Sequence, residues 1–280
     1  MRTLARRAGC ATVVSAKRSK SHTILSGRSK ILAAILEVPR AIEFHHVFKS
    51  FAGTVALSNL ELSVPPASLY VLLGPNGAGK TTALRMLPGL LHPDLGSVMV
   101  NGIDVATEHS QAKRQLAYLP DEPLLYPLLR PLEYLEFIAA LWSMPASAAG
   151  RQAEDLLRWL ELWDHRSKFI ESFSRGMKQK LALAGAMLHD PTILLMDEPL
   201  TGLDVASARI VKDLIRDFVG KGNTVVLTTH IMELAENLEA RIGILNAGKM
   251  IAQGTLQDLR QKAGHERLED IFLRFINGSL

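Results

Sequence analysis

The segment GPNGAGKTT, residues 74–82, combines three glycines with a lysine and two threonines directly after the apolar run LYVLL. It fits the pattern G-x-x-x-x-G-K-[ST], in which glycines let successive backbone N–H groups converge on phosphate oxygens. The lysine of this pattern reaches the β- and γ-phosphates, and the next hydroxyl is a ligand of Mg²⁺. A glycine-rich turn alone would explain the glycines but not the lysine and hydroxyl. We therefore predict a phosphate-binding loop that contains Gly74, Pro75, Asn76, Gly77, Ala78, Gly79, Lys80, Thr81 and Thr82.

The segment ILLMDE, residues 193–198, places two carboxylates directly after four apolar residues. Burial of these charges is costly unless other groups compensate them. The alternative is that the two acids lie at a strand end that is exposed to solvent. If this strand lies beside the phosphate loop, Asp197 can bind Mg²⁺ through water. Successive strand residues point to opposite faces, so Glu198 would lie on the other side and orient the water that attacks the γ-phosphate. We therefore predict that Asp197 holds the metal and Glu198 activates the water.

Short apolar runs predict the strands that position these groups. LYVLL (69–73), TILLMD (192–197) and TVVLTTH (224–230) lack polar alternation, which is typical of parallel strands covered on both faces. Two further strands are expected at 41–48 and 60–64, separated by the turn-like KSFAGT, and a hairpin is expected at 93–105.

Helical spacing of leucines begins near Pro131 and continues to about Leu188, and a second helical segment covers 205–219. The segment 241–254 is expected to form a final pair of strands before a helical C-terminus. Together these patterns predict an α/β core interrupted by a helical lobe at about 125–185.

Composition limits the possible classes of protein. No apolar stretch reaches the roughly 18 residues that a membrane-spanning helix needs, and the single Cys10 excludes an intramolecular disulfide. The net charge of +4 comes from residues 1–36, which contain eight lysines and arginines and no acid. We therefore predict no nucleic-acid-binding surface on the fold. The basic tail, residues 1–40, is interpreted as disordered or non-native sequence, with an organellar transit peptide as the alternative.

Further segments of the chain lie on either side of the two acids, Asp197 and Glu198. FSRGMKQKLALAGAMLHDP (173–191) precedes the two acids, PLTGLD (199–204) follows them, and TVVLTTH ends in His230. Phe51 lies upstream, in FKSFAGTVAL. With the phosphate loop, these segments resemble the nucleotide-binding subunit of ATP-binding cassette (ABC) transporters over about residues 41–275.

The resemblance implies the ABC ATPase fold, which is a P-loop NTPase core with a mixed sheet, an antiparallel β subdomain and a helical subdomain. Residues 276–280 would form the C-terminal end. The resemblance also implies that Phe51 stacks on adenine, that Asp204 ends the D-loop and that His230 contacts the γ-phosphate. The implied signature segment contains Ser174, Arg175, Gly176 and Met177.

Ser174 and the Gly176 backbone open a predicted helix and therefore form a second possible anion site. One chain would therefore carry two phosphate sites. In the family, two subunits pair head to tail, so that each ATP lies between one phosphate loop and the partner's signature segment. The expected partner is a second copy of this chain or a homologous ATPase subunit.

Two residues depart from the family pattern. Arg175 replaces the usual second glycine of the signature segment, where it could repel or recruit charge near the partner's ATP. Asp121, in YLPDEP (118–123), stands where most relatives carry a glutamine that contacts Mg²⁺. We interpret Asp121 as a mark of an exporter subtype.

The resemblance thus implies an ATPase that uses ATP and Mg²⁺ to power transport, with export as the expected direction. An integral membrane permease would be a separate partner, and its helix could dock near residues 124–137. The chain would then lie at the cytoplasmic face of the cell membrane. The alternatives are a soluble ABC ATPase in an assembly process such as iron–sulfur cluster biogenesis, and a non-hydrolysing regulator, which Glu198 and His230 disfavour.

Overall fold

The computed structural model describes residues 40–264 and 267–277. The basic segment that precedes residue 40 lies outside the described residues, so the interpretation of the tail stays a prediction.

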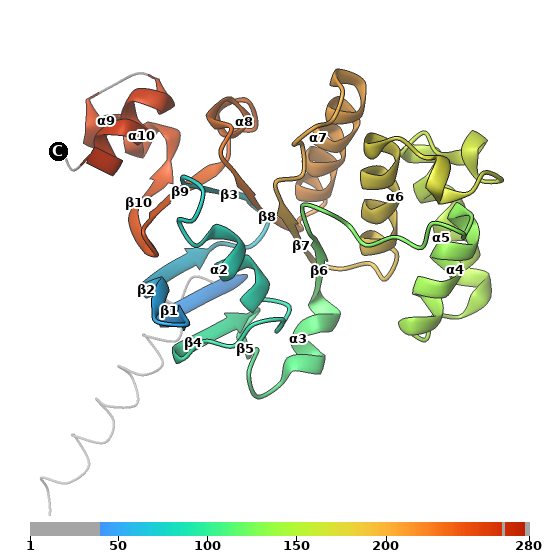
Figure 1. The fold of residues 1–280 in the computed structure, drawn as a ribbon, viewed down its shortest axis with the longest axis horizontal. Coiled ribbons are helices and arrows are strands. Elements are labelled where there is room, and N and C mark those ends of the chain that lie inside the picture. Colours follow the sequence, from blue (N-terminus) through green and yellow to red (C-terminus); the bar gives the residue numbers. More distant parts are fainter. Residues whose placement is uncertain (1–39, 265–266, 278–280) are drawn as a thin grey trace, which may run out of the picture. The chain divides into compact units, whose positions relative to one another are not determined.

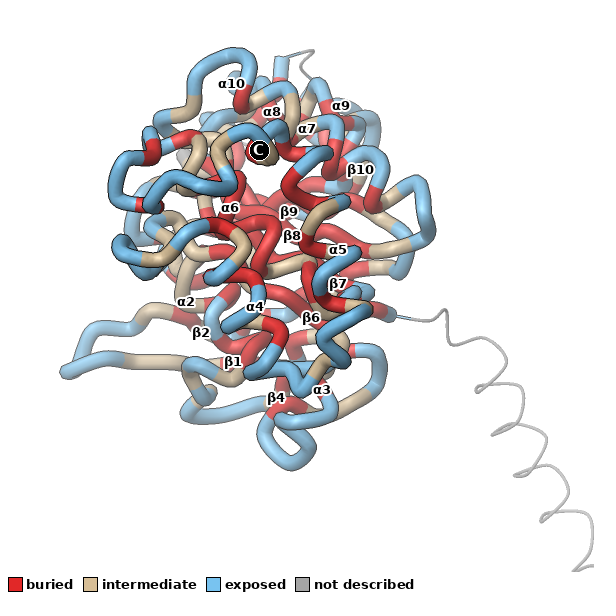
Figure 2. The backbone as a smooth tube through the Cα atoms, turned by 90° about the vertical axis from the view of Figure 1, so that its right-hand side faces the viewer, coloured by how far each residue is buried: buried red, intermediate tan, exposed pale blue. Residues whose placement is uncertain are grey.

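A six-stranded sheet carries the buried apolar runs, in the order β10-β9-β3-β8-β7-β6. Five of its strands are parallel, and β10 pairs antiparallel with β9 at one edge. The strands are β3 (Leu69–Leu73), β6 (Leu116–Leu119), β7 (Ile193–Asp197), β8 (Thr224–Thr229), β9 (Arg241–Asn246) and β10 (Lys249–Thr255). The predicted strands 192–197 and 224–230 are confirmed within one residue at each end. Figure 2 shows that buried residues run through this sheet.

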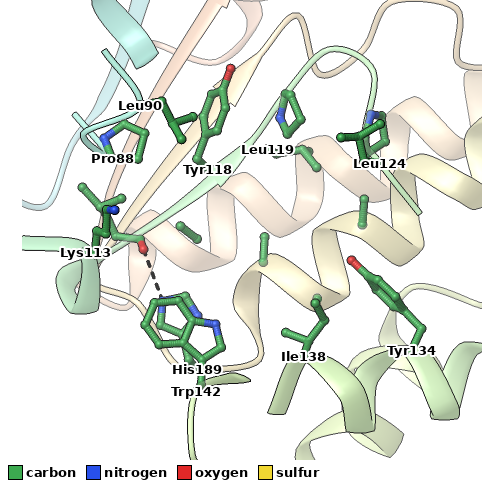
Figure 3. A pocket seen from close by; sticks show the side chains of 17 residues that line it. Pro88, Leu90, Lys113, Tyr118, Leu119, Leu124, Tyr134, Ile138, Trp142 and His189 are labelled. Carbon is green, nitrogen blue, oxygen red and sulfur yellow. Dashed lines mark hydrogen bonds between the residues drawn. The ribbon is translucent and has the colours of Figure 1, made fainter. Parts of the chain in front are cut away.

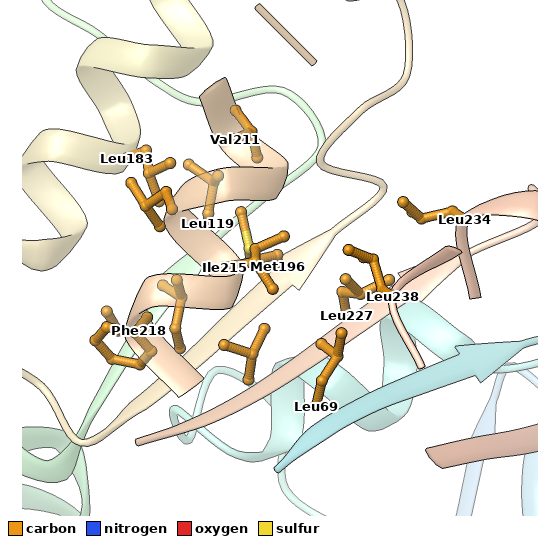
Figure 4. Close-up of a cluster of buried hydrophobic side chains, with 14 of the residues drawn as sticks. Leu69, Leu119, Leu183, Met196, Val211, Ile215, Phe218, Leu227, Leu234 and Leu238 are labelled. Atoms are coloured by element: carbon orange, nitrogen blue, oxygen red, sulfur yellow. The ribbon is translucent and has the colours of Figure 1, made fainter. Parts of the chain in front are cut away.

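Alternate residues of the central strands face two different hydrophobic cores. Met196 of β7 and Leu227 of β8 pack against α7 (Val205–Gly220), whose Val211, Ile215 and Phe218 point toward the sheet (Figure 4). Side chains one position away enter the second core, which is shared with α2 (Lys80–Met86) and a smaller sheet. The continuous apolar runs therefore reflect burial on both faces.

The smaller sheet is antiparallel and has the order β2-β1-β4-β5. Its strands are β1 (Ile42–Phe51), β2 (Thr54–Val64), β4 (Leu95–Val100) and β5 (Ile103–Asp104). The hairpin expected at 93–105 is confirmed as β4 and β5. The expected turn over KSFAGT is wrong in extent, because β1 and β2 continue through it and pair Phe51 with Thr54. Ala52 and Gly53 alone turn the chain, both with positive φ.

The segment between β6 and β7 is mainly helical, and its helices lie on the same side of the sheet as α7 (Figure 1). They are α4 (Pro131–Leu141), α5 (Ala146–Trp159), the short 3₁₀ turns η1 (Trp163–His165) and η2 (Ile170–Ser172), and α6 (Arg175–Met187). α4 begins at Pro131, which fits the first helical position, and Glu133 closes a capping box with Arg130.

The remaining helices flank the two sheets. They are α3 (His109–Gln115), α8 (Met232–Asn237), α9 (Leu256–Ala263) and α10 (Leu268–Asn277). The predicted helical C-terminus is confirmed by α9 and α10. Across residues 40–264 and 267–277, every helix is too short or too polar to cross a bilayer.

Candidate active site: a phosphate loop beside two carboxylates

The predicted phosphate loop connects β3 to α2 and is shaped by glycine. Gly79 has a φ of 104°, and a Cβ atom at this position would lie 2.6 Å from the Ala56 carbonyl oxygen and 2.8 Å from Leu57 Cδ2. Only glycine therefore permits both the backbone conformation and the close approach to β2. Within the loop, Asn76 and Gly77 are exposed, Pro75 is half-buried and Ala78 is buried.

Lys80 crosses the loop and is almost fully buried. Its Nζ donates to the carbonyl oxygens of Gly74 at 2.8 Å and Pro75 at 3.3 Å, and it lies 3.9 Å from Glu198 Oε1. Burial lowers the pKa of Lys80, whereas the charges of Glu198 and Asp197 oppose this shift. The ammonium group is thus held between the loop backbone and the acids, where it can meet a triphosphate.

Asp197 is the last residue of β7 and is 3% exposed. Its Oδ1 accepts hydrogen bonds from Thr81 Oγ1 at 3.1 Å and from Thr228 Oγ1 at 2.5 Å. Two hydroxyl groups therefore compensate the buried carboxylate. Because a carboxylate and a hydroxyl converge here, the donor set fits Mg²⁺, which prefers oxygen ligands.

Glu198 does not continue the strand, since its φ is 46° and β7 ends at Asp197. Its N–H donates to the Thr228 carbonyl oxygen at 3.1 Å, which fixes the turn. The expected separation by strand alternation is therefore wrong. The backbone at Glu198 has a positive φ, and this turn separates the two acids instead. Asp197 contacts Thr81, whereas Glu198 lies near Lys80.

The Glu198 carboxylate is held by groups from two loops. His230 Nδ1 lies 3.0 Å from Glu198 Oε1, and Thr201 Oγ1 donates to Oε2 at 3.4 Å. His230 is 54% exposed, whereas the Glu198 side chain is 15% exposed. Glu198 thus lies between His230 and Lys80, and the roles predicted for these three residues stay predictions.

Ser174 caps α6, and its Oγ accepts from the Met177 N–H at 3.2 Å. Gly176 is buried against the start of α7, because a Cβ atom there would lie 2.9 Å from Ser207 Oγ. Asp204 caps α7 and accepts from the Ser207 N–H at 2.8 Å and from Ser207 Oγ at 2.9 Å. These contacts lower the pKa of Asp204. The signature segment therefore packs directly on the predicted D-loop.

The two departures from the family pattern meet in space. Arg175 Nη2 lies 3.7 Å from Asp121 Oδ1. Burial raises the pKa of Asp121 and Arg175 opposes the shift, while the nearby Asp197 and Glu198 add to it. The negative charges of Asp197 and Glu198 therefore act on the Asp121 carboxylate.

Phe51 ends β1 and is 45% exposed, with Lys49 Nζ 5.3 Å from the ring centroid. An exposed ring is compatible with base stacking. Thr82 is a half-buried residue in the first turn of α2. The roles of Phe51 and Thr82 stay predictions.

Sequence reasoning missed Thr228 and Thr201 as site residues. Thr228 is fully buried one residue before the end of β8. Its hydroxyl donates to Asp197, and its backbone and hydroxyl oxygens accept from the Glu198 N–H. A hydroxyl residue inside the otherwise apolar run TVVLTTH was the available signal, because a buried hydroxyl needs a partner.

An apolar groove with a volume of about 420 Å³ lies between β6, α4 and α6. Tyr118, Leu124, Tyr134 and Ile138 line it, and the ring of His189 stacks on Trp142 with centroids 3.9 Å apart (Figure 3). Leu124 at its rim is 93% exposed. Pro120, Pro123 and Leu124 line the groove, and the same loop contains Asp121.

Sequence comparison matches residues 57–201 to the family described as ABC transporter. A daunorubicin resistance ATP-binding protein from Streptomyces coeruleorubidus is 38% identical over 81% of this chain and 71% of that protein. A Nod factor export ATP-binding protein from Burkholderia lata is 36% identical over 76% of this chain and 70% of that protein.

Structure comparison gives the same result. The ATP-binding subunit of an ABC transporter superposes with a TM-score of 0.78 at 30% identity, covering 84% of this chain and 99% of that chain. A dimeric ATP-binding cassette in a post-hydrolysis state, bound to ADP and Pi, superposes with a TM-score of 0.70 at 25% identity, covering 76% of this chain and 98% of that chain.

Proposed function

The chain belongs to the ABC transporter ATP-binding family, and on this premise we propose how its own residues bind and hydrolyse ATP and which partners it drives. As a member of this family it is an ATP-binding subunit and an ATPase. Its relatives are named for drug resistance and for Nod factor export, so the ATPase powers export through a separate permease.

The observation that carries the proposal is the convergence of Lys80, Asp197 and Glu198 at one end of the six-stranded sheet. Loop N–H groups and Lys80 bind the β- and γ-phosphates. Thr81 and, through water, Asp197 would hold Mg²⁺, which supplies neutralisation of phosphate charge when it is bound. Phe51 stacks on the adenine.

Glu198 acts as the general base in this proposal. It accepts a proton from water as the water oxygen attacks the γ-phosphorus, and the bond to the oxygen that bridges the β- and γ-phosphorus atoms breaks. His230 holds the Glu198 carboxylate at 3.0 Å. In this proposal His230 also contacts the γ-phosphate. ADP and phosphate are the products.

The signature residues Ser174, Arg175, Gly176 and Met177 would face the ATP of a second subunit in a head-to-tail dimer. The N-terminus of α6 supports this assignment because its N–H groups and dipole favour an anion. Asp204 at the adjoining D-loop would lie at the same interface. A dimeric relative with ADP and Pi supports the arrangement.

The groove around Tyr118, Ile138 and Trp142 would receive a helix of the permease. Its apolar lining and the exposed Leu124 at its rim favour an apolar partner surface. The ATPase would thereby be held at the cytoplasmic face of the cell membrane. Because the groove adjoins Asp121, movement at the phosphate site can reach the permease through one short loop.

The test is purification of the tagged full chain from detergent-solubilised membranes of its native host. We expect a multi-span integral membrane protein in stoichiometric amount, identified by mass spectrometry. Leu124→Glu should abolish this capture, whereas Leu95→Glu, which changes a leucine that is 67% exposed outside the groove, should not. Equal capture by both variants would reject the groove as the docking site, and absence of any such protein would reject the permease.

A further inference from the structure

Arg175 brings three separate segments of the described chain together. It is the first residue of α6, its Nη2 lies 3.7 Å from Asp121 Oδ1, and Asp121 belongs to the loop after β6. A Cβ atom on Gly202 would lie 2.8 Å from Arg175 Nη1 and 2.9 Å from its Cζ. The guanidinium group therefore lies against the loop between β7 and α7, which also contains Asp204.

The absence of a side chain at residue 202 makes this contact possible. Gly202 has a φ of 72°, a conformation that favours glycine, and it leaves the space that the guanidinium group fills. Asp121 Oδ1 is buried without a hydrogen-bond partner among the described residues, so Arg175 is the nearby cation that offsets its charge. The space beside Gly202 and the position of Asp121 Oδ1 therefore both fit an arginine at residue 175.

Charge explains why Asp121 needs such a partner. It adds a third carboxylate to the end of the sheet that already carries Asp197 and Glu198, and all three would face an anionic triphosphate. Without compensation, a third negative charge would weaken nucleotide binding. The positive charge of Arg175 is placed to remove this penalty within the same subunit.

We propose that Arg175 is a positioning residue that neutralises Asp121 and fixes the loop after β6 and the 199–204 loop beside the phosphate loop of its own subunit. The inference rests on the proposed phosphate site. It adds a role within the same subunit to the proposed one, in which residue 175 faces the ATP of the partner subunit.

Double-mutant analysis separates the two roles. We would measure the KM for ATP and kcat of the full chain with Mg²⁺ for Arg175→Met, Asp121→Asn and the double variant. An exposed ion pair of this kind is worth about 0.2–1 kcal/mol, so Arg175→Met should raise KM about 1.4- to fivefold, with a smaller change in kcat. Asp121→Asn alone should leave KM near the wild-type value or lower it. The double variant should return KM to that of Asp121→Asn.

The decisive outcome is the rescue. If Arg175 acts only on the partner's ATP, the KM of Arg175→Met will stay raised when Asp121 is neutralised, and the proposal is wrong. An unchanged KM in Arg175→Met also overturns it. Hydrolysis by the wild-type chain tests the proposed function separately, because a chain without ATPase activity fails before any coupling is measured.

The pair Arg216 and Asp213 on α7 provides the matched control. Their ion pair is 3.0 Å long and their side chains are 54% and 53% exposed, close to the 56% and 47% of Arg175 and Asp121. Arg216→Met, Asp213→Asn and their double variant should leave KM unchanged. Thermal melting of each variant checks that the KM differences do not come from loss of fold, and an equal KM rise in this control set would refute a specific role for Arg175.

Discussion

Glu198 Oε1 and His230 Nδ1 lie 3.0 Å apart, although the two residues directly follow different strands, β7 and β8. When Nδ1 carries the proton, the ring donates to the carboxylate, and in the proposed mechanism Nε2 is the atom that faces the phosphate. β7 and β8 are neighbours in the sheet, so their register sets this distance. The proposed catalytic geometry therefore depends on strand pairing as well as on the two side chains.

Replacement of His230 by alanine should slow hydrolysis more than it weakens ATP binding. The carboxylate of Glu198 would lose its orienting partner, and misplacement of about 1 Å can cost roughly 100-fold in rate. We expect kcat to fall about 10- to 100-fold with little change in KM. Steady-state phosphate release checks this.

His46→Ala is the matched control, because His46 is also exposed and carboxylate-paired, with Nδ1 2.8 Å from Glu61 Oε1. Its kcat should equal that of the wild type. A wild-type kcat in His230→Ala would show that Glu198 needs no help from the histidine.

Lys80→Met should abolish the stabilisation of the protein by ATP without unfolding it. Methionine keeps an apolar stem in the buried position but cannot neutralise phosphate. At an ATP concentration about 100 times Kd, the wild type should gain about 2.7 kcal/mol of stability, and the variant should gain none. Thermal melting with and without ATP measures both values. An ATP-dependent shift in Lys80→Met equal to that of the wild type would contradict the role of Lys80.

The pH dependence of ATP binding should follow the charge of Lys80. Burial lowers the pKa of this residue below the ordinary value of 10.5, so the charge is lost earlier as pH rises. ATP affinity should therefore weaken in the alkaline range below pH 10.5. In the same window the unfolded chain binds more protons at this residue, so its contribution to the free energy of unfolding rises with pH. Calorimetric titration with ATP at several pH values tests the first statement.

Much of the fold followed from the sequence because its central strands are buried on both faces. LYVLL, TILLMD and TVVLTTH have no polar alternation, and each became a parallel strand with two cores around it. The extent of the first hairpin did not follow, because KSFAGT contains turn residues that pair across β1 and β2 instead. Pairing with a neighbouring strand overrode the local turn preference.

Gly185→Ala should destabilise the packing of α6 on α4. A Cβ atom at Gly185 would lie 2.8 Å from the Tyr134 hydroxyl oxygen and 2.9 Å from its Cε1. Such overpacking typically costs about 1–3 kcal/mol, which urea unfolding can measure.

Gly150→Ala provides the opposite control, because among the described residues no atom outside the adjacent turns of α5 lies within 4 Å of the added Cβ. Alanine is favoured over glycine inside a helix by about 0.5–1 kcal/mol, so this variant should be more stable than the wild type. If Gly185→Ala is also stabilised, the described contact of α6 with Tyr134 is incorrect.

The site could be predicted where a motif is contiguous and could not be predicted where contacts cross the fold. The loop from Gly74 to Thr82 is read directly from nine consecutive residues. The hydrogen bond from Thr228 to Asp197 and the ion pair between Arg175 and Asp121 join residues 31 and 54 positions apart. The turn at Glu198 was missed because nothing in ILLMDE marks a positive φ. These relationships arise from strand order and loop packing.

The most direct test is phosphate release by Glu198→Gln in the full chain with ATP and Mg²⁺. Glutamine keeps the shape of the side chain but cannot accept the proton from water, and loss of a general base costs about 10²–10⁴ in rate. We predict that the variant binds ATP as tightly as the wild type, forms a dimer with ATP but not with ADP, and releases phosphate at least about 100-fold more slowly. Phosphate release at the wild-type rate would contradict the assignment of Glu198 as the base.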